Sequence, residues 1–431
     1  MLERKIINEL SIWKENPYKQ CLVVKGARQV GKTTIIEKFA KEKYTNVVTI
    51  NFVEAPRLKT IFDGDLSKEE IWRQISIRMP NTELISGETL LFLDEIQLCP
   101  NARTALKFLA RDERYDVIAS GSLLGINYDE VVSFPVGFVD YAQMHSLDFE
   151  EFCWAMGMTK TAFGYVREYF DKKEIVPAAT HERMMELFKQ YIIIGGMPEV
   201  INTFLAANNY GKVLNVQRNL IEEYKKDIAK YAAGAEKAKA RNCFLSIPKQ
   251  LAKRQKKFQY SIVEKGGNRR KYYGSLMWLL DAGIINMCHN LSAPELPLEG
   301  NSKEDEFKVY MADTGLLMSM LEEGSQEDII DGNLGIYKGA IYENIIADIF
   351  AKSGKPLYYF EKNNRLEIDF FLRQERCATA IEVKSGNNTK SQSINTIVKH
   401  YGVKKAIKLS TKNVYENDTL LGLPLYMACF L

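Results

Sequence analysis

The chain has few residues of the types that build metal sites and disulfide frameworks. Only four histidines occur, and none stands at metal-ligand spacing from another. The seven cysteines are odd in number and scattered, with no C-x-x-C pair. These absences argue against a disulfide framework and a thiolate zinc site, and they are typical of a protein from a reducing compartment.

Long apolar runs are also missing. No stretch approaches the roughly eighteen apolar residues of a membrane-spanning helix. The N-terminal sequence MLERKIINEL carries charges where a signal peptide has its apolar centre. We therefore expect a cytoplasmic protein that does not span a membrane.

What is present is the composition of a folded globular chain. Of 431 residues, 46% are hydrophobic and 26% are charged, which excludes a disordered or low-complexity protein. At roughly a hundred to two hundred residues per domain, this length predicts about three domains. Fifty-eight basic and fifty-five acidic residues give a net charge of +3. That average conceals one segment, 237–271, whose twelve basic residues and single acid give +11 and leave −8 for the rest.

Residues 1–150 have the pattern of a parallel α/β sheet, in which short apolar runs alternate with helical patterns. The expected strands are 21–24, 46–52, 89–95, 116–122 and about 137–144, and the expected helices include 67–79 and 102–111. Ser67 and Glu70 have the spacing of a capping box, which predicts the start of the first of these helices.

Residues 26–33 read G-x-x-x-x-G-K-T and lie between an expected strand and an expected helix, the context of a P-loop. Backbone N–H groups of such a loop cradle phosphates at the positive N-terminus of the helix. Lys32 would act on the β- and γ-phosphates of ATP, and the Thr33 hydroxyl would hold Mg²⁺. A plain Gly-rich turn is the alternative. The expected nucleotide-binding residues are Gly26, Ala27, Arg28, Gln29, Val30, Gly31, Lys32, Thr33 and Thr34.

An apolar strand that ends in Asp94 and Glu95 supports the nucleotide hypothesis. Asp94 suits Mg²⁺, directly or through water, and Glu95 suits the catalytic base that polarises the attacking water. Ser120 and Ser122 end the next expected strand, where they would sense the γ-phosphate or merely turn the chain.

Arginine is absent between Tyr115 and Val166, the region in which an AAA-type ATPase usually offers an arginine finger to its neighbour. Arg103, Arg111 and Arg114 are the remaining candidates, with a solvated helix face as the alternative. Hydrolysis coupled to a homo-oligomer therefore has no support in the sequence.

Residues 236–322 predict a winged helix. A helical pattern is followed by a turn at Gly266-Gly267, a recognition helix over 268–278, and a two-stranded wing formed by IINMCHN and FKVYMAD. The basic side chains would neutralise DNA phosphates, whereas a solvated charged face or a docking site for an acidic protein is the alternative. The expected nucleic-acid contacts are Lys253, Arg254, Lys256, Lys257, Arg269, Arg270 and Lys271.

The C-terminal region predicts a helix over 337–350 followed by the strands YYF, LEIDFFL and ATAIEVK. Period-two geometry places Glu382 and Lys384 on one face of their strand and pairs Glu367 with Asp369 on theirs. Such a cluster could bind a divalent metal and activate a water for phosphodiester attack. A structural ion pair of Glu382 with Lys384 or Arg365 is the alternative. The expected catalytic residues are Asp369, Glu382 and Lys384, and the expected ligands of a second Mg²⁺ or Mn²⁺ are Glu343, Asp369 and Glu382.

Taken in order, these motifs resemble those of prokaryotic AAA-type ATPases that carry a C-terminal domain of the PD-(D/E)xK nuclease superfamily. The resemblance spans nearly the whole chain. It rests on GARQVGKTT (26–34), LDEIQ (93–97), SGS (120–122), LDFEEF (147–152), GGMPEV (195–200), DTGLL (313–317), YEN (342–344), EIDFFL (367–372) and IEVKSG (381–386). The turn PVGF (135–138) departs from many relatives, which have Gly-Arg there.

The resemblance implies ATP binding by Lys32 and Thr33, with Asp94 and Glu95 at the metal and the water. It also implies a nuclease-like fold around the C-terminal carboxylates. We therefore expect a P-loop ATPase core over 1–150, a helical extension over 151–235, a winged helix over 236–322 and a nuclease-like domain over 323–431. The expected function is ATP hydrolysis coupled to DNA binding and metal-dependent cleavage. A nucleotide switch that recruits a protein partner, with an inactive nuclease-like scaffold, is the alternative.

Overall fold

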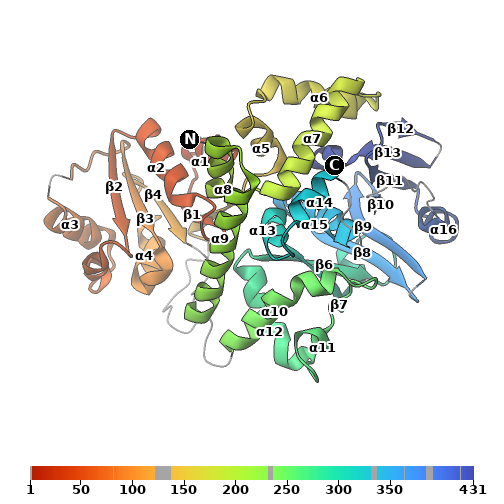
Figure 1. Ribbon diagram of the computed structural model, residues 1–431. Coiled ribbons are helices and arrows are strands. Elements are labelled where there is room, and N and C mark those ends of the chain that lie inside the picture. Colours follow the sequence, from red (N-terminus) through yellow and green to blue (C-terminus); the bar gives the residue numbers. More distant parts are fainter. Residues whose placement is uncertain are drawn as a thin grey trace. The chain divides into compact units, whose positions relative to one another are not determined.

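The computed structural model describes residues 2–80, 82–121, 137–231, 236–331, 337–363, 365–384, 392–417 and 419–431. The chain divides into two compact units, Met1–Ser146 and Leu147–Leu431, and each is described by itself. Figure 1 gives the order of their elements. None of the described helices is both long and apolar enough to cross a membrane.

The first unit is built on a parallel sheet, as the alternating pattern predicts. Its five described strands lie in the order β2-β3-β4-β1-β5. They are β1 (Cys21–Lys25), β2 (Asn46–Asn51), β3 (Thr89–Asp94), β4 (Asp116–Gly121) and β5 (Val139–Gln143). The helices are α1 (Ile6–Glu15), α2 (Lys32–Lys43), α3 (Lys68–Arg78) and α4 (Pro100–Leu109). All five expected strands are confirmed, although Ser122 lies outside the described residues.

Strand β3 is buried along its whole length and packs into the apolar core of this unit. A parallel strand with helices on both faces has no polar side, which explains its continuous apolar run. Because the carboxyl ends of parallel strands meet at one edge of the sheet, Asn51, Asp94 and Gly121 all end at the edge that the P-loop occupies.

The predicted capping box is wrong, although α3 begins where it was expected. Ser67 is the N-cap residue but makes no side-chain cap hydrogen bond. The Glu70 carboxylate instead accepts from Arg73 Nη1 and Gln74 Nε2, each at 2.7 Å. Arg73 and Gln74, one turn later on the helix, therefore occupy the carboxylate that a capping box would direct to the Ser67 N–H.

The second unit begins with helices, as predicted. They are α5 (Phe149–Ala155), α6 (Lys160–Lys172), α7 (Ala178–Ile194), α8 (Pro198–Ala207), α9 (Tyr210–Tyr231), α10 (Glu236–Leu251), α11 (Tyr260–Val263) and α12 (Arg269–Asp281). Helix α7 ends at Gly195, whose φ of 74° favours glycine. Helix α12 begins after Asn268, whose side chain accepts from the Lys271 N–H at 3.1 Å.

One sheet runs through the rest of this unit, and its described strands lie in the order β12-β13-β11-β10-β9-β8-β6-β7. They are β6 (Ile285–Leu291), β7 (Ser302–Met311), β8 (Leu357–Lys362), β9 (Leu366–Gln374), β10 (Cys377–Val383), β11 (Lys405–Ser410), β12 (Tyr415–Glu416) and β13 (Leu420–Pro424). The helices are α13 (Thr314–Ser319), α14 (Ser325–Asp331), α15 (Tyr337–Lys352) and α16 (Gln392–Tyr401).

The two strands expected as a wing do pair with each other, β6 antiparallel to β7. However, β6 also pairs with β8 in parallel, so both strands belong to the C-terminal sheet. The sheet therefore crosses the domain boundary expected between residues 322 and 323. The hydrogen-bonding edge of β6 that a free wing would expose is covered by β8.

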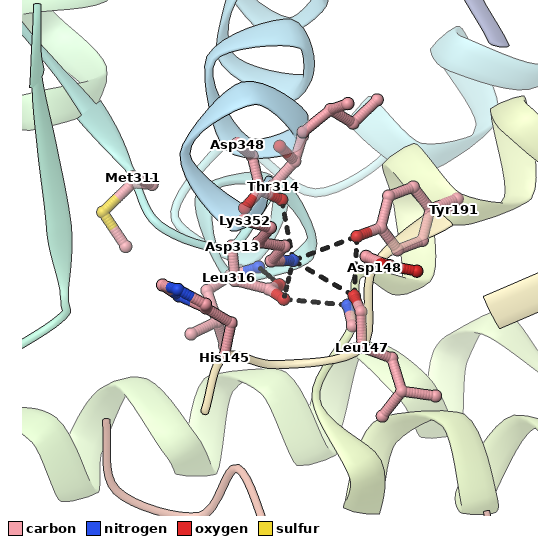
Figure 2. A network of polar contacts seen from close by, with 12 residues as sticks. His145, Leu147, Asp148, Tyr191, Met311, Asp313, Thr314, Leu316, Asp348 and Lys352 are labelled. Atoms are coloured by element: carbon pink, nitrogen blue, oxygen red, sulfur yellow. Dashed lines mark hydrogen bonds and ion pairs between the residues drawn. The ribbon is translucent and has the colours of Figure 1, made fainter. Parts of the chain in front are cut away.

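A buried polar cluster holds the start of the second unit (Figure 2). Lys352, on α15, is the centre of this Lys352 cluster, and its side chain is only 2% exposed. Its ammonium lies 3.0 Å from Asp348 Oδ2 and 3.9 Å from Asp313 Oδ2. It also donates to the Leu147 carbonyl at 3.1 Å and to Tyr191 Oη at 3.0 Å. Tyr191 Oη donates in turn to the same Leu147 carbonyl at 2.7 Å.

Backbone packing around the Lys352 cluster requires small residues. A Cβ at Gly196 would lie 2.1 Å from the Leu147 carbonyl oxygen, and one at Gly195 would lie 2.2 Å from Asp313 Oδ1. A Cβ at Gly315 would lie 2.4 Å from the Ile194 carbonyl oxygen. The motifs LDFEEF, GGMPEV and DTGLL therefore meet at one place, because each supplies a part of this cluster.

Burial raises the pKa of Asp348 to about 7, with Lys352 opposing and Asp313 reinforcing the shift. Two carboxylates thus share one ammonium, and removing that ammonium leaves their charge uncompensated in the core. We expect Lys352→Met to lower the free energy of unfolding of the second unit by about 3–5 kcal/mol. Urea unfolding and amide hydrogen exchange of the peptide that begins at Leu147 measure this loss.

The matched control is Lys212→Met, at an exposed position of α9, which should change the unfolding free energy by less than about 0.5 kcal/mol. Equal stability of the two variants would show that the Lys352 cluster does not stabilise the unit.

Candidate functional site

The P-loop connects β1 to α2, and its backbone is shaped by residues in left-handed conformation. Gly31, the N-cap residue of α2, has φ of 94°, and Gln29 has φ of 63°. Gly26 cannot be replaced without a shift, because a Cβ there would lie 2.1 Å from the Met144 carbonyl oxygen. Gln29 and Thr34 are exposed, whereas Val30 is buried.

Lys32 extends back into the loop that precedes it and is only 7% exposed. Its ammonium donates to the carbonyl oxygens of Gly26, at 3.0 Å, and Ala27, at 2.8 Å. Burial lowers the pKa of Lys32 to about 8, against the effect of the Glu95 and Asp94 carboxylates and with the help of Arg28. A buried ammonium inside a loop of backbone N–H groups is suited to a polyanion.

Asp94 lies at the end of β3, 2% exposed, and accepts hydrogen bonds from four described donors. Thr33 Oγ1 and Asn51 Nδ2 donate to Oδ2 at 2.9 and 3.1 Å. The Glu95 N–H donates to Oδ1 at 3.1 Å, and the Ser120 hydroxyl donates to the same oxygen. The structure therefore brings Thr33, Asp94 and Ser120 together. Asn51 was missed, although its position at the end of an expected strand was a usable signal.

Glu95 follows in a left-handed conformation, with φ of 56°. Gln97 Nε2 donates to Glu95 Oε2, and a Cβ at Gly121 would lie 2.4 Å from Gln97 Oε1. The backbone at the end of β4 thus packs against the side chain that orients Glu95. Gln97 was not predicted, because its spacing from Glu95 suggests no contact before the 3₁₀ turn over Ile96–Leu98 is known.

Arg4 is a further residue that sequence reasoning missed. It is buried, and its guanidinium donates to the Val30 carbonyl at 2.9 Å and to the His145 carbonyl at 2.6 Å. It therefore ties the P-loop to the chain that follows β5. No local pattern marks this residue, since its partners lie 26 and 141 positions away.

The arginine-finger candidates are partly committed to contacts within the first unit. Arg114 makes a two-point contact with Asp112, at 2.8 and 2.7 Å. The Arg111 guanidinium lies 5.0 Å from the centre of the Phe138 ring. A guanidinium that already has a bidentate carboxylate partner is a poor donor to a neighbouring site.

In the second unit, Asp369 lies on β9, Glu382 on the neighbouring strand β10, and Lys384 directly after the end of β10. Asp369 Oδ2 accepts from the Val383 N–H at 2.7 Å, and Lys384 Nζ lies 2.8 Å from Glu382 Oε1. Glu382 is buried, and its Oε2 has no hydrogen-bond partner among the described residues. Burial raises the pKa of Asp369 to about 7; nearby Glu343 adds to the shift and Lys308 opposes it.

Glu343, predicted as a metal ligand, is instead neutralised by two ammonium groups. Lys256 forms an ion pair with its Oε1, and Lys308 Nζ lies 3.7 Å from its Oε2. Lys308 is fully buried and lies 2.5 Å from Glu367 Oε1. Within the described ranges, no group of three or more His, Cys, Asp or Glu side chains could hold a metal ion. The ligand set of Glu343, Asp369 and Glu382 is therefore not assembled, because lysines compensate the charge of Glu343.

The basic segment carries less free charge than its sequence implies. Besides Lys256, Lys257 lies 3.2 Å from Glu306, and Lys271 forms an ion pair with Glu264. Arg269 contacts Asp305 and lies 3.6 Å from Glu304. The predicted nucleic-acid residues that are exposed and have no such ion pair among the described residues are Lys253, Arg254 and Arg270.

Models of known protein families match three segments of the chain. Residues 18–153 match the model of an AAA domain. Residues 185–327 and 338–426 match two domains of unknown function, DUF8612 and DUF4143. No curated protein sequence matches the chain.

Similar solved structures include a Walker-type ATPase of Pyrococcus abyssi, with 14% identity, a TM-score of 0.46, and 74% of this chain and 96% of that one covered. Another is the Aeropyrum pernix ORC1 protein in complex with DNA, with 10% identity, a TM-score of 0.30, and coverage of 76% and 92%. The AMPPCP-bound DnaA of Aquifex aeolicus has 11% identity, a TM-score of 0.28, and coverage of 64% and 86%. Likenesses this weak carry no argument about function. The sheet order, the G-x-x-x-x-G-K-T loop and the domain match together identify residues 18–153 as an AAA-type P-loop ATPase fold.

Proposed function

We propose that the first unit binds ATP with Mg²⁺ and hydrolyses it. The observation that carries this proposal is the contact of Thr33 with Asp94 beside the buried ammonium of Lys32. In P-loop enzymes these three residue types hold the metal and the terminal phosphates.

The residues fit a nucleotide and its metal. Thr33 Oγ1 and Asp94 Oδ2 are 2.9 Å apart, so both can face one cation, and a Cβ at Gly26 would disturb the loop that cradles the phosphates. Mg²⁺, when bound there, would neutralise charge on the phosphates. Glu95 would orient the attacking water as a base, Gln97 would hold Glu95, and Ser120 would position Asp94.

We expect Lys32→Ala to abolish ATP binding and turnover, because the phosphates lose their only buried ammonium among the described residues of this loop. Glu95→Gln should retain ATP binding and lower kcat by about 10²–10⁴-fold, the usual contribution of a positioned base. Lys41→Ala, at an exposed position of α2, is the control and should leave both unchanged. Phosphate release and nucleotide titration measure these effects. Unchanged turnover in Lys32→Ala would contradict the assignment.

The depressed pKa of Lys32, about 8, predicts a pH dependence of nucleotide binding. Bound phosphates would raise this pKa, so binding above pH 8 must take up a proton. We expect the affinity for ADP to fall by up to about tenfold per pH unit above pH 8, and Lys32→Arg, which stays charged, to have a flatter profile. Calorimetry in two buffers of different ionisation enthalpy measures the number of protons that are taken up when the nucleotide binds. Identical profiles for the two proteins, with no uptake at pH 8.5, would refute this explanation.

We further propose that ATP turnover accompanies DNA binding by the second unit, through the exposed side chains of Lys253, Arg254 and Arg270. Their exposure without acidic partners in the described chain supports this role. We also propose that Asp369, Glu382 and Lys384 cleave the bound DNA with the help of a divalent metal. Their adjacency and the Oε2 of Glu382, which has no hydrogen-bond partner among the described residues, support this part of the proposal.

A scaffold that recruits a protein partner is the competing function. The ion pair between Lys384 and Glu382, together with the lysines at Glu343, favours it, since in the described part of the chain these contacts compensate the charge of two of the three expected metal ligands.

Replacement of Lys253, Arg254 and Arg270 by Glu should weaken binding of duplex DNA and lower the salt slope by about 2–3, roughly one per lost phosphate contact. Lys212→Glu on α9 is the control: it makes the same change of charge at one exposed site that is not among the proposed DNA contacts, and it should leave DNA binding unchanged. In the same assay, cleavage with Mg²⁺ or Mn²⁺ should vanish in Asp369→Ala and Lys384→Ala. A DNA affinity that does not change with salt concentration would contradict DNA binding by these residues. DNA binding without cleavage by the native protein would favour the scaffold.

A further inference from the structure

The second unit contains a polar cavity of about 330 Å³ that the functions above do not use. It lies where the ends of β6 and β8 meet the start of β7 and the segment that follows α10. Its polar lining includes Asn290, Lys257, Lys303, Lys362, Glu306 and Glu361. Three lysines and two glutamates thus line the cavity, which has a net positive charge. Lys257 and Lys303 face a carboxylate, whereas the Lys362 ammonium lies 5.3 Å from the centre of the Tyr401 ring.

Glu306 organises two of these ammonium groups. Its carboxylate lies 3.2 Å from Lys257 Nζ and 3.3 Å from Lys303 Nζ, and it accepts from Asn290 Nδ2 at 2.6 Å. The Asn290 hydrogen bond is the largest influence that lowers the pKa of Glu306, to about 2, so this carboxylate is ionised throughout the physiological range. Each ammonium has three N–H donors, and one contact with Glu306 leaves others for a ligand.

Asn290 makes this arrangement rigid. It is buried, and besides its bond to Glu306 it accepts from the Glu361 N–H at 2.9 Å and donates to the Glu361 carbonyl at 3.3 Å. Both ends of its amide are therefore fixed by β8, which holds the carboxylate and the two lysines in place. Side chains held before binding lose little entropy when a ligand arrives.

The cavity selects against a stacked base. Its aromatic wall is Phe360, which is buried and 1% exposed, so its ring face is not offered to a ligand. The remaining lining is rich in ammonium, amide and hydroxyl groups, which recognise phosphate oxygens and sugar hydroxyls. A volume of about 330 Å³ is at the small end of ligand sites.

We propose that this cavity binds a phosphomonoester dianion attached to a sugar. Lys257, Lys303 and Lys362 hold the phosphate, and Glu361 and the amide side chains accept or donate to the sugar hydroxyls. The neighbouring residues Lys256 and Lys257 then have different roles. Lys256 compensates the negative charge of Glu343, whereas Lys257 lines the cavity. This assignment does not depend on ATP hydrolysis in the first unit.

The test uses the full chain carrying Lys32→Ala, so that the P-loop does not compete for phosphate, and ribose 5-phosphate as the probe. Calorimetry should detect saturable binding at one site. Lys303→Gln and Lys362→Gln should each weaken it by about tenfold, the loss of one charge-assisted contact. Lys212→Gln, at an exposed lysine of α9 outside the cavity, is the matched control and should bind as before.

A second arm distinguishes the source of the phosphate. Binding of a 5′-phosphorylated oligonucleotide through the same lysines, with ribose 5-phosphate much weaker, supports the end of a nucleic-acid strand as the ligand. Tight binding of ribose 5-phosphate alone supports a free sugar phosphate. Absence of saturable binding of both probes at millimolar concentration, or binding that neither lysine variant weakens, overturns the proposal. ATP turnover by chains carrying only Lys303→Gln or Lys362→Gln should equal that of the native protein, which separates this test from that of the P-loop.

Discussion

The carboxylate of Asp94 determines how the first unit is assembled at the edge of its sheet. A buried carboxylate is costly unless several donors replace its water. Here the donors come from the start of α2, the end of β2, the end of β4 and the backbone of the next residue. These segments converge on one side chain in the observed order β2-β3-β4-β1, in which the strands are parallel. Strand order, loop position and the chemistry of the edge therefore depend on one another.

Much of this unit follows from its sequence. Alternation of apolar runs and helical patterns predicts the strands, and G-x-x-x-x-G-K-T predicts the loop with Lys32 at its end. What local pattern does not predict are contacts made by topology. Arg4 reaches Val30 and His145 because α1 and β5 both return to the P-loop, a fact that no spacing encodes. The capping box failed for a different, local reason, since the Glu70 carboxylate has other partners on its own helix.

The second unit is harder to derive from sequence, because charge sign is visible in a sequence and charge pairing is not. The basic segment predicts a cationic surface, yet Lys256 and Lys257 are held by Glu343 and Glu306 from elsewhere in the unit. Lys308 stands two residues after Glu306, a spacing that is uninformative by itself, but its burial beside Glu343 and Glu367 makes it part of the carboxylate cluster. The strands β8, β9 and β10 were predicted from their apolar runs, whereas the joining of β6 to β8 needed long-range pairing.

The contacts of Leu147 limit where the chain can be divided into separately expressed fragments. Compactness places the start of the second unit at this residue. Its N–H donates to the Gly196 carbonyl at 2.7 Å, and its own carbonyl accepts from the buried ammonium of Lys352. A fragment beginning here would carry a charged α-amino group on the residue that already faces a buried cation, and like charges in the interior repel strongly. A separately expressed second unit therefore needs several residues of the preceding chain to keep that terminal charge in water.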